Sequence, residues 1–402
     1  MSSEPARATL RGRSSAETRS AVLDLIRSSG EITRVELSRR AGLTEATISK
    51  IVNELIANGV VVTSGRARST GGKPATLLRL STTELWSVGI VLDLPQIVVV
   101  LSSLDGAAAG TAEIAATRED DPDAVLAWIV VAIHELLAEH GATRDSLIGI
   151  GVALPGRRDY QGANPLDWWE QISVRERLEK LIGIEVLLEN DANCAALQEF
   201  WSGGLAPERD FAVVYAADGV GAGIIIDGDV YRGRSGQAGE IGHVFVDGAG
   251  PVCWCGRRGC LEVTGTPLAV AHRVHDMPEL MAELGLADDV PLRGIYAAVA
   301  TRAMSEPASR AAELIRGAAE RVATAIVGMV NTLDLDLIVL AGPGFADAGD
   351  IYLETVRAAL EHTYVRSVHP VEVRLRTFGT DASALGAASL VLHRRLTPHH
   401  AA

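Results

Sequence analysis

The apolar positions near the start of the chain recur at the three- and four-residue spacing of short helices. Val22, Leu25 and Ile26 fall on one face of a helix predicted over residues 17–29. A second, shorter helix is predicted over about residues 34–40. The chain therefore begins with a small helical module.

A third helix follows a glycine turn. In the turn Ala41-Gly42-Leu43 the glycine permits a positive φ, and Thr44 is the predicted N-cap of a helix that runs to Ala57. The apolar stripe of this helix consists of Ile48, Ile51, Val52 and Leu55. The polar residues on its exposed faces, and hence the candidates for contacts with DNA, are Thr44, Glu45, Thr47, Ser49, Lys50 and Asn53.

A strand, a glycine-rich loop and a second strand are predicted over residues 60–80, with Arg66, Arg68 and Lys73 on the loop. Three helices followed by a basic hairpin resemble the winged helix-turn-helix of bacterial repressors. There the third helix specifies bases in the major groove and the wing contacts phosphate or the minor groove. The alternative is a small helical bundle with an incidental basic loop.

The pattern changes after about residue 85, where runs of Val, Ile and Leu alternate with helices, which predicts an α/β fold with sheets covered on both faces. The first series consists of runs at 86–94, 96–104 and 147–156, with a helix at about 121–139. The second consists of runs at 211–217, 221–227, 335–342 and 371–379. These two series of apolar strands predict two lobes, and we expect the ligand to bind in a cleft between them.

Charge supports the division into a DNA-binding module and a body. Residues 1–80 hold 13 Lys and Arg against 7 Asp and Glu, a net of +6, and because the whole chain carries −14, the remainder carries −20. Neutralisation of phosphate is local, so an acidic average does not exclude DNA. The sequence shows no signal-peptide core and no run of about 20 apolar residues, so we expect a cytoplasmic protein without membrane contact.

Three of the four cysteines lie within eight positions, which favours a metal site over a disulfide framework. Cys253, Cys255 and Cys260 with His243 form a Cys₃His set, which suits a tetrahedral, structural Zn²⁺. Three buried free cysteines are the alternative interpretation. Cys194, away from this set, is interpreted as a buried apolar residue.

Four runs of the body resemble the ROK family, which comprises repressors, uncharacterised reading frames and sugar kinases. They are Gly151-Val-Ala-Leu-Pro-Gly156, Glu189-Asn-Asp-Ala-Asn193, Ala238-Gly-Glu-Ile-Gly-His243 and the cysteine run Cys253–Glu262. The resemblance implies a winged helix-turn-helix followed by a two-lobed, actin-like sugar-kinase fold of the ATPase type. The domains would be residues 1–82, a first lobe at 83–195 joined by a C-terminal helix within 382–402, and a second lobe at 196–381 with the zinc site and a dimerisation surface.

The resemblance also implies a sugar site, in which carboxylates accept hydrogen bonds from hydroxyl groups and an amide both donates and accepts. The residues it assigns to the site are Gly156, which admits the sugar close to the backbone, Asn190, Asp191, Glu240, His243 and Glu262. One ring nitrogen of His243 would bind zinc while the other faces the ligand.

The phosphate loop of the family's kinases, Asp-x-Gly-x-Thr, is not retained. The corresponding stretch is Val91-Leu-Asp93-Leu-Pro95, so Val91 stands at the aspartate position and the glycine and threonine are absent. Asp191, the position of the kinase base, would then act only as a hydrogen-bond acceptor. We therefore expect no enzyme activity.

The resulting hypothesis is a repressor of carbohydrate-metabolism genes, in which a homodimer, or a tetramer, binds operator DNA and a sugar effector alters that binding. Two alternatives are a ROK sugar kinase that also binds DNA, and a regulator controlled by a protein partner, with a vestigial sugar site.

Overall fold

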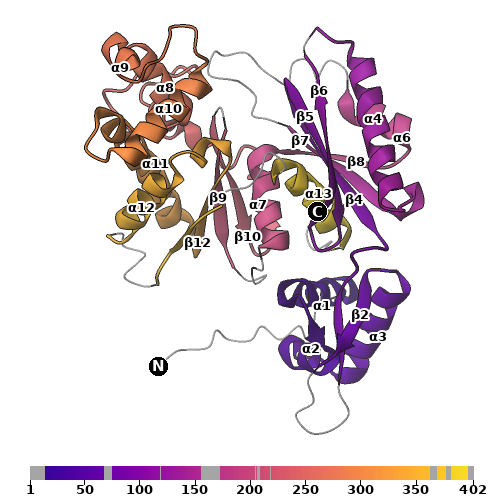
Figure 1. Ribbon diagram of the computed structural model, residues 1–402. Coiled ribbons are helices and arrows are strands. Elements are labelled where there is room, and N and C mark those ends of the chain that lie inside the picture. The colour runs from indigo at the N-terminus through magenta and orange to yellow at the C-terminus, as the bar shows by residue number, and fades with distance from the viewer. Residues whose placement is uncertain are drawn as a thin grey trace.

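The structure is a computed structural model, and it describes residues 14–67, 75–117, 119–154, 173–203, 205, 209–217, 219–362, 369–376 and 382–396. Figure 1 shows a small N-terminal head below a body with two sheets. Within the described ranges, no helix combines the length and the hydropathy that a bilayer crossing requires.

The head contains three helices and a three-stranded sheet of order β1-β3-β2. The elements are α1 (Ser15–Ser29), β1 (Ile32–Thr33), α2 (Arg34–Ala41), α3 (Glu45–Ala57), β2 (Val61–Arg66) and β3 (Thr76–Leu80). Gly42 ends α2 with φ 63°, and the Thr44 hydroxyl accepts a hydrogen bond from the Thr47 N–H at the start of α3. The predicted helices and hairpin are thus confirmed. The short strand β1, which pairs with β3, was not anticipated.

The first sheet of the body has the order β6-β5-β4-β7-β8. Its strands are β4 (Trp86–Asp93), β5 (Gln96–Ser103), β6 (Ala108–Ala115), β7 (Leu147–Leu154), after the short 3₁₀ helix η1 (Arg144–Ser146), and β8 (Val186–Asn190). Strands β4, β7 and β8 are parallel, so their carboxyl ends meet at one edge of the sheet. One face packs on α4 (Pro122–Glu139) and α6 (Val174–Ile182), and the other on α13 (Ala382–Leu396).

The second sheet has the order β11-β10-β9-β12-β13. Its strands are β9 (Phe211–Ala216), β10 (Val220–Ile226), β11 (Asp229–Val230), β12 (Leu337–Ala341) and β13 (Glu372–Leu375). The predicted hairpin at Asp227-Gly228 is confirmed, with φ 53° and 77°. The large apolar cluster on one face involves α8 (Pro267–His275), α9 (Pro278–Glu283), α10 (Leu292–Ser305), α11 (Arg310–Leu333), η4 (Pro343–Phe345) and α12 (Gly349–Leu360).

Helix α7 (Asp191–Ser202) lies between the second sheet and α13, and these two helices connect the halves of the body (Figure 1). Residues 195 and 196, between which the sequence predicts the boundary of the lobes, lie in the middle of α7. The packing is close: a Cβ at Gly223 would lie 2.1 Å from the Ala192 carbonyl oxygen, and one at Gly386 2.1 Å from that of Cys194. Helix α7 is therefore held on two sides.

Helix α13 crosses β4 and β7 at two glycines in the same way. A Cβ at Gly89 would lie 1.7 Å from the Ala384 carbonyl oxygen, and one at Gly151 1.8 Å from that of Ala387. Only glycine therefore permits this approach of helix to sheet.

We expect Gly89→Ala to destabilise the body, because α13 must move away from the sheet to admit the methyl group. Overpacking of this kind typically costs about 1–3 kcal/mol, which for a body of this size lowers Tm by roughly 5 °C. Thermal unfolding followed by circular dichroism measures it. Gly328→Ala is the matched control, because a Cβ there meets nothing within 4 Å, and an equal loss in both variants would contradict the prediction.

Candidate functional site

Three cysteines and a histidine gather beside the second sheet. His243 ends the 3₁₀ turn η2 (Ile241–His243), and Cys260 immediately precedes η3 (Leu261–Val263). The four potential ligand atoms of His243, Cys253, Cys255 and Cys260 all lie within 4.8 Å of one another. Two of the separations are 3.7 Å, from Cys253 Sγ to His243 Nδ1, and 3.6 Å, from Cys255 Sγ to Cys260 Sγ.

These separations suit a tetrahedral ion. With sulfur at about 2.3 Å from zinc, tetrahedral ligands lie about 3.8 Å apart. The cysteine loop also has the necessary tight turns, because Gly256 and Gly259 have φ 88° and 73°. Burial, together with the neighbouring thiols, raises the pKa of Cys260 to about 12. A bound cation would stabilise the thiolate and oppose this shift.

His243 presents Nδ1 to the thiols. Its ring packs edge-on against Trp254, with centroids 4.5 Å apart and an interplanar angle of 86°. Because the two ring nitrogens of an imidazole point in diverging directions, Nε2 does not face the same partner as Nδ1. The geometry is compatible with the dual role expected for this residue.

Asn190 and Asp191 lie at the junction of β8 and α7, at the carboxyl edge of the first sheet. Asn190 Oδ1 accepts hydrogen bonds from the N–H groups of Ala192, at 2.9 Å, and Asn193, at 3.4 Å, so this side chain also caps α7. Asp191 Oδ1 accepts from the Ala192 N–H at 2.8 Å. Gly156, also expected at the sugar site, lies outside the described residues.

Asp191 is half-buried among like charges. Burial raises the pKa of its carboxyl group to about 7, the Ala192 N–H opposes this shift, and the charges of Asp93 and Glu240 add to it. Asp93 ends β4, whereas Glu240 immediately precedes η2 in the second half of the body. Carboxylates from both halves thus act on one site.

The proximity of Asp93 to this site was not predicted from the sequence. The stretch Val91–Pro95 was noted only because it lacks the glycine and threonine of the kinase phosphate loop. The available signal was its position at the carboxyl end of β4, because ligands of open α/β sheets bind outside the carboxyl ends of parallel strands. An ion pair was also missed. Arg232, after β11, lies 2.8 Å from Glu189 on β8 and joins the two sheets beside Asn190.

Glu262 is buried, with 6% of its surface exposed. Its Oε2 accepts a hydrogen bond from the Val220 N–H at 3.1 Å. A Cβ at Gly219 or Gly242 would lie 2.6 Å from its carboxylate oxygens, so two glycines make room for it. Glu262 therefore connects the cysteine loop to the start of β10.

The candidate DNA contacts lie on the head. Most of those on or beside α3 are exposed, namely Thr44, Glu45, Thr47, Lys50 and Asn53. Ser49 is half-buried, and Asn53 Oδ1 accepts a hydrogen bond from Arg34 at 2.9 Å. Arg66 ends β2 and is exposed, whereas Arg68 and Lys73 lie outside the described residues.

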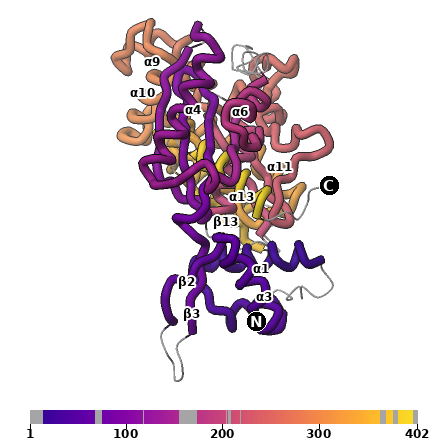
Figure 2. The backbone as a smooth tube through the Cα atoms, turned by 90° about the vertical axis from the view of Figure 1, so that its right-hand side faces the viewer, coloured from indigo at the N-terminus to yellow at the C-terminus, as the bar shows by residue number. Residues whose placement is uncertain are grey.

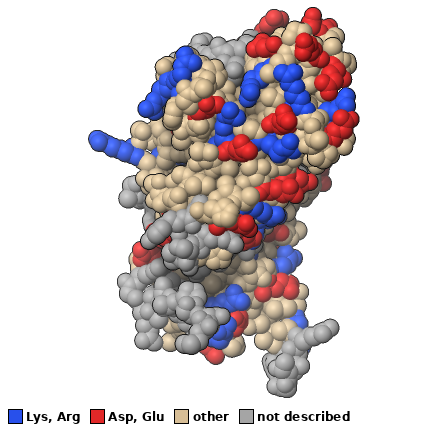
Figure 3. Space-filling model, turned by 90° about the vertical axis from the view of Figure 1, so that its left-hand side faces the viewer, with Lys and Arg blue, Asp and Glu red and all other residues tan. Residues whose placement is uncertain are grey.

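The body surface visible in Figure 3 carries Lys, Arg, Asp and Glu interspersed over its upper part. That part presents no extended region of a single sign among the residues shown in colour.

Comparison with known proteins matches both parts of the chain. Residues 16–62 match a winged helix-turn-helix DNA-binding model. A putative xylose repressor from Caldicellulosiruptor sp. (strain Rt8B.4) is 27% identical over 366 residues, 90% of this chain and 92% of its own length. A glucokinase from Halalkalibacterium halodurans is 29% identical over 318 residues, 77% of this chain and 95% of its own.

A solved structure has the same overall fold. The crystal structure of a ROK family transcriptional regulator, a homologue of the E. coli MLC protein, superposes with a TM-score of 0.70 at 23% identity and covers 95% of this chain and 96% of its own. The ROK family model itself matches residues 95–394, which is most of the chain and includes the second sheet, the strands of the first sheet after β4, the cysteine cluster, and Asp191 and Glu240. The chain therefore belongs to the ROK family.

Proposed function

We propose that the protein is a DNA-binding transcriptional repressor of carbohydrate-metabolism genes whose effector is a sugar bound between the two halves of the body. The observation that carries the proposal is the joining, in one chain, of a winged helix-turn-helix to a ROK body in which the charges of Asp93 and Glu240 act on Asp191. The repressor relative matches the head as well as the body, whereas the glucokinase relative is matched over 77% of this chain.

The residues around Asp191 include groups suited to a sugar. Asp191 and Glu240 would accept hydrogen bonds from neighbouring hydroxyls, the amide of Asn190 would donate, and Nε2 of His243 would bind a further oxygen. Because Asp191 and Glu240 come from different halves, a ligand bound to both would favour a closed arrangement. Glu262 would act indirectly, because its carboxylate holds the backbone at Val220 through a hydrogen bond.

Zn²⁺ is the proposed structural cofactor, bound by His243, Cys253, Cys255 and Cys260. The donor set and the 3.6–3.7 Å separations support it. All four positions of a tetrahedral ion would be filled by protein, so the ion would stabilise the fold and leave no position for catalysis. It would also orient His243 toward the cleft.

Kinase activity is not part of the proposal. The stretch from Val91 to Pro95 lacks the flexible backbone loop that cradles phosphate, and Asp93 adds a negative charge beside Asp191. A purified protein that hydrolysed ATP in the presence of a hexose would favour the kinase alternative.

The test combines ligand binding with DNA binding. Zinc-loaded protein is screened by thermal shift against D-xylose, D-glucose, N-acetylglucosamine and their phosphates, and operator fragments are selected from a random duplex library. A ligand at a hundredfold excess over its Kd stabilises the folded state by about 2.7 kcal/mol. We expect one sugar class to raise Tm and to alter operator affinity, and Glu240→Ala to lose both effects. A repressor without any sugar response would overturn the proposed control.

We expect Arg66→Gln to weaken binding to operator and to random DNA by similar factors. Arg66 is exposed at the start of the wing, where it is expected to contact phosphate rather than a base edge. The slope of log K against log salt should fall in magnitude by about 1, which fluorescence anisotropy at several salt concentrations measures. Arg310→Gln, at the start of α11, is the control in the body. A loss restricted to the operator would instead indicate a base contact.

A further inference from the structure

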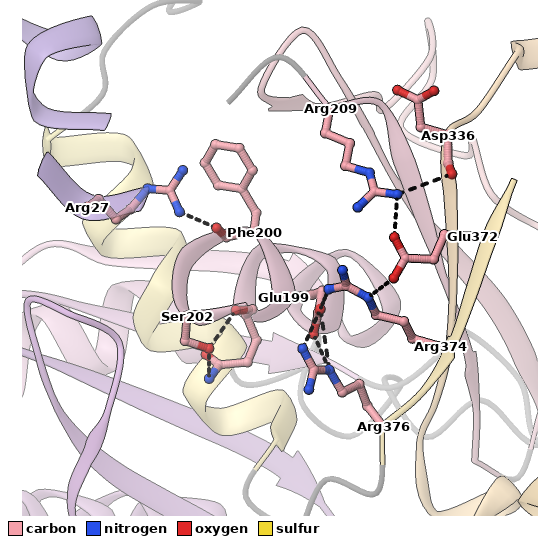
Figure 4. Close-up of polar contacts among 10 residues, drawn as sticks. Arg27, Glu199, Phe200, Ser202, Arg209, Asp336, Glu372, Arg374 and Arg376 are labelled. Carbon is pink, nitrogen blue, oxygen red and sulfur yellow. Dashed lines mark hydrogen bonds and ion pairs between the residues drawn. The ribbon is translucent and has the colours of Figure 1, made fainter. Parts of the chain in front are cut away.

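An arginine of the DNA-binding head is buried against the body. Arg27, on α1, is 8% exposed, and its Nη1 donates hydrogen bonds to the carbonyl oxygens of Phe200 and, at 3.2 Å, of Trp201 at the end of α7. Its guanidinium carbon lies 4.2 Å from the centroid of the Phe200 ring. Figure 4 shows the side chain of Arg27 extended toward this last turn of α7.

A second buried side chain, Asp24, supports the contact of Arg27 with α7. Asp24, one turn earlier on α1, accepts a hydrogen bond from Arg27 Nε at 3.3 Å, and both side chains are almost fully buried. A buried guanidinium requires such partners, because desolvation of an unpaired charge is strongly unfavourable. The carbonyl groups at the C-terminus of a helix also carry partial negative charge, which favours a cation there.

The surrounding side chains join the head and the body in one apolar cluster. Val22 and Ile26 of α1, Phe200 and Trp201 of α7, and Leu392 of α13 all belong to it. Figures 1 and 2 agree in placing α1 on the side of the head that faces the body. The head is therefore docked on the ends of α7 and α13.

The opposite end of α7 carries the proposed sugar site at Asn190 and Asp191. Asn190 caps the helix, Asp191 is its first residue, and Trp201 lies in its last turn. A helix of twelve residues is about 18 Å long, so one rigid element spans from the cleft to Arg27.

The sides of α7 leave it little freedom to bend. Gly223 of β10 and Gly386 of α13 meet its backbone without room for a Cβ. Near its end the buried Glu199 forms an ion pair with Arg376, just after β13, at 3.0 Å, and lies 3.7 Å from Arg374 (Figure 4). A displacement at Asp191 must then move the helix as a unit, including the carbonyl groups that Arg27 binds.

We propose that α7 transmits sugar binding at Asp191 to the DNA-binding head, and that Arg27 is the residue through which the head responds to it. The proposal rests on the proposed function, because it explains how a sugar at one end of α7 alters DNA affinity at the other. Arg27 contacts neither DNA nor sugar in this scheme and acts as a positioning residue.

The first experiment needs no sugar. Operator affinity is measured for wild type, Asp191→Asn, Arg27→Met and the double variant, using the selected operator duplex. Distant residues that share no element usually give additive effects, whereas a shared rigid element gives coupling. We expect Asp191→Asn to change operator affinity severalfold in the wild-type background and less than twofold beside Arg27→Met. Multiplicative effects would overturn the proposal.

The second experiment separates this proposal from the proposed function. Sugar binding and operator binding are measured on the same variants, and reciprocity requires that each ligand alter the affinity of the other by one factor. We expect that factor to exceed about fivefold in wild type and to approach one in Arg27→Met, with sugar affinity of the DNA-free protein retained. A wild type without any sugar effect refutes the proposed function, whereas an unchanged factor in Arg27→Met refutes the role of Arg27.

Two further variants distinguish a loss of the sugar response from a loss of folding. Arg19→Met, an exposed arginine on the same helix, should retain the full response. Phe200→Leu removes the ring beneath Arg27 from the other side of the contact while keeping the position apolar, and it should also reduce the response. Arg27→Met and Phe200→Leu protein that melts as one cooperative unit yet keeps a wild-type response would overturn the proposal.

Discussion

Protein in which Cys253 is replaced by serine is expected to lose its zinc and to melt roughly 10 °C or more below wild type. Cys253 is buried and lies 3.7 Å from His243, so the substitution removes one of the four proposed ligands and leaves the coordination sphere of the proposed zinc open. Because His243 ends η2 and Cys260 immediately precedes η3, the loss should spread to the neighbouring Glu240 and Glu262. Metal analysis of the purified protein and a thermal melt measure the two effects.

The matched control is Cys194→Ala. Cys194 is fully buried on α7 and lies outside the metal cluster. This variant should keep one zinc per chain and lose only the contacts of a single sulfur atom. A strong chelator should reproduce the destabilisation in wild type and in Cys194→Ala. Equal zinc content in the Cys253→Ser protein would contradict the assigned ligand set.

Asp191→Asn is expected to lower sugar affinity about 10- to 100-fold, because a hydrogen bond to a charged acceptor is lost. The same substitution should make the protein more stable at alkaline pH, because it removes a half-buried charge. The ordinary pKa of an aspartate is about 3.9. Burial raises that of Asp191 to about 7. Between these values the folded chain retains a proton that the unfolded chain has released. The stability contributed by this group is therefore complete below about pH 4 and is lost as the pH rises through about 7.

The measurement is a pair of melting curves across pH. At pH 8 Asp191→Asn should melt about 3 °C above wild type, and the difference should shrink toward pH 5. Binding of the sugar identified in the thermal-shift screen gives the second readout. Glu113→Gln, an exposed carboxylate on β6, is the control and should change neither. An Asp191→Asn protein that binds sugar normally would remove this residue from the site.

The sequence was sufficient to predict the elements whose signal is local. The stripe of α3, the cap at Thr44 and the glycine turn at Gly42 all lie within one helix or turn, so periodicity and capping rules identify them. The gathering of His243 with three cysteines was also predictable, because the cysteines are close together in sequence. Asp191 and Glu240 were proposed for the site through family motifs, and the structure brings them close enough for the charge of one to act on the other.

Other features depend on tertiary packing that no local pattern records. Arginine is rarely buried, so the interior position of Arg27 was not expected, and its partners are 173 and 174 residues away. The ion pair of Glu189 with Arg232 depends in the same way on the approach of two sheets. The position of Asp93 beside Asp191 was not predicted, because its stretch was compared only with the phosphate loop of the kinases.

The docking of α1 on α7 and α13 also bears on the geometry of the operator. A head joined to its body through a shared apolar cluster cannot rotate freely about a tether. If two copies bind a two-fold site, the body fixes both the distance between their recognition helices and the face of the duplex that each one meets. Inserting about five base pairs between half-sites turns the second site to the far side of the double helix, since one turn is about 10 base pairs. Such a protein recognises the helical phase of its target as well as the sequence.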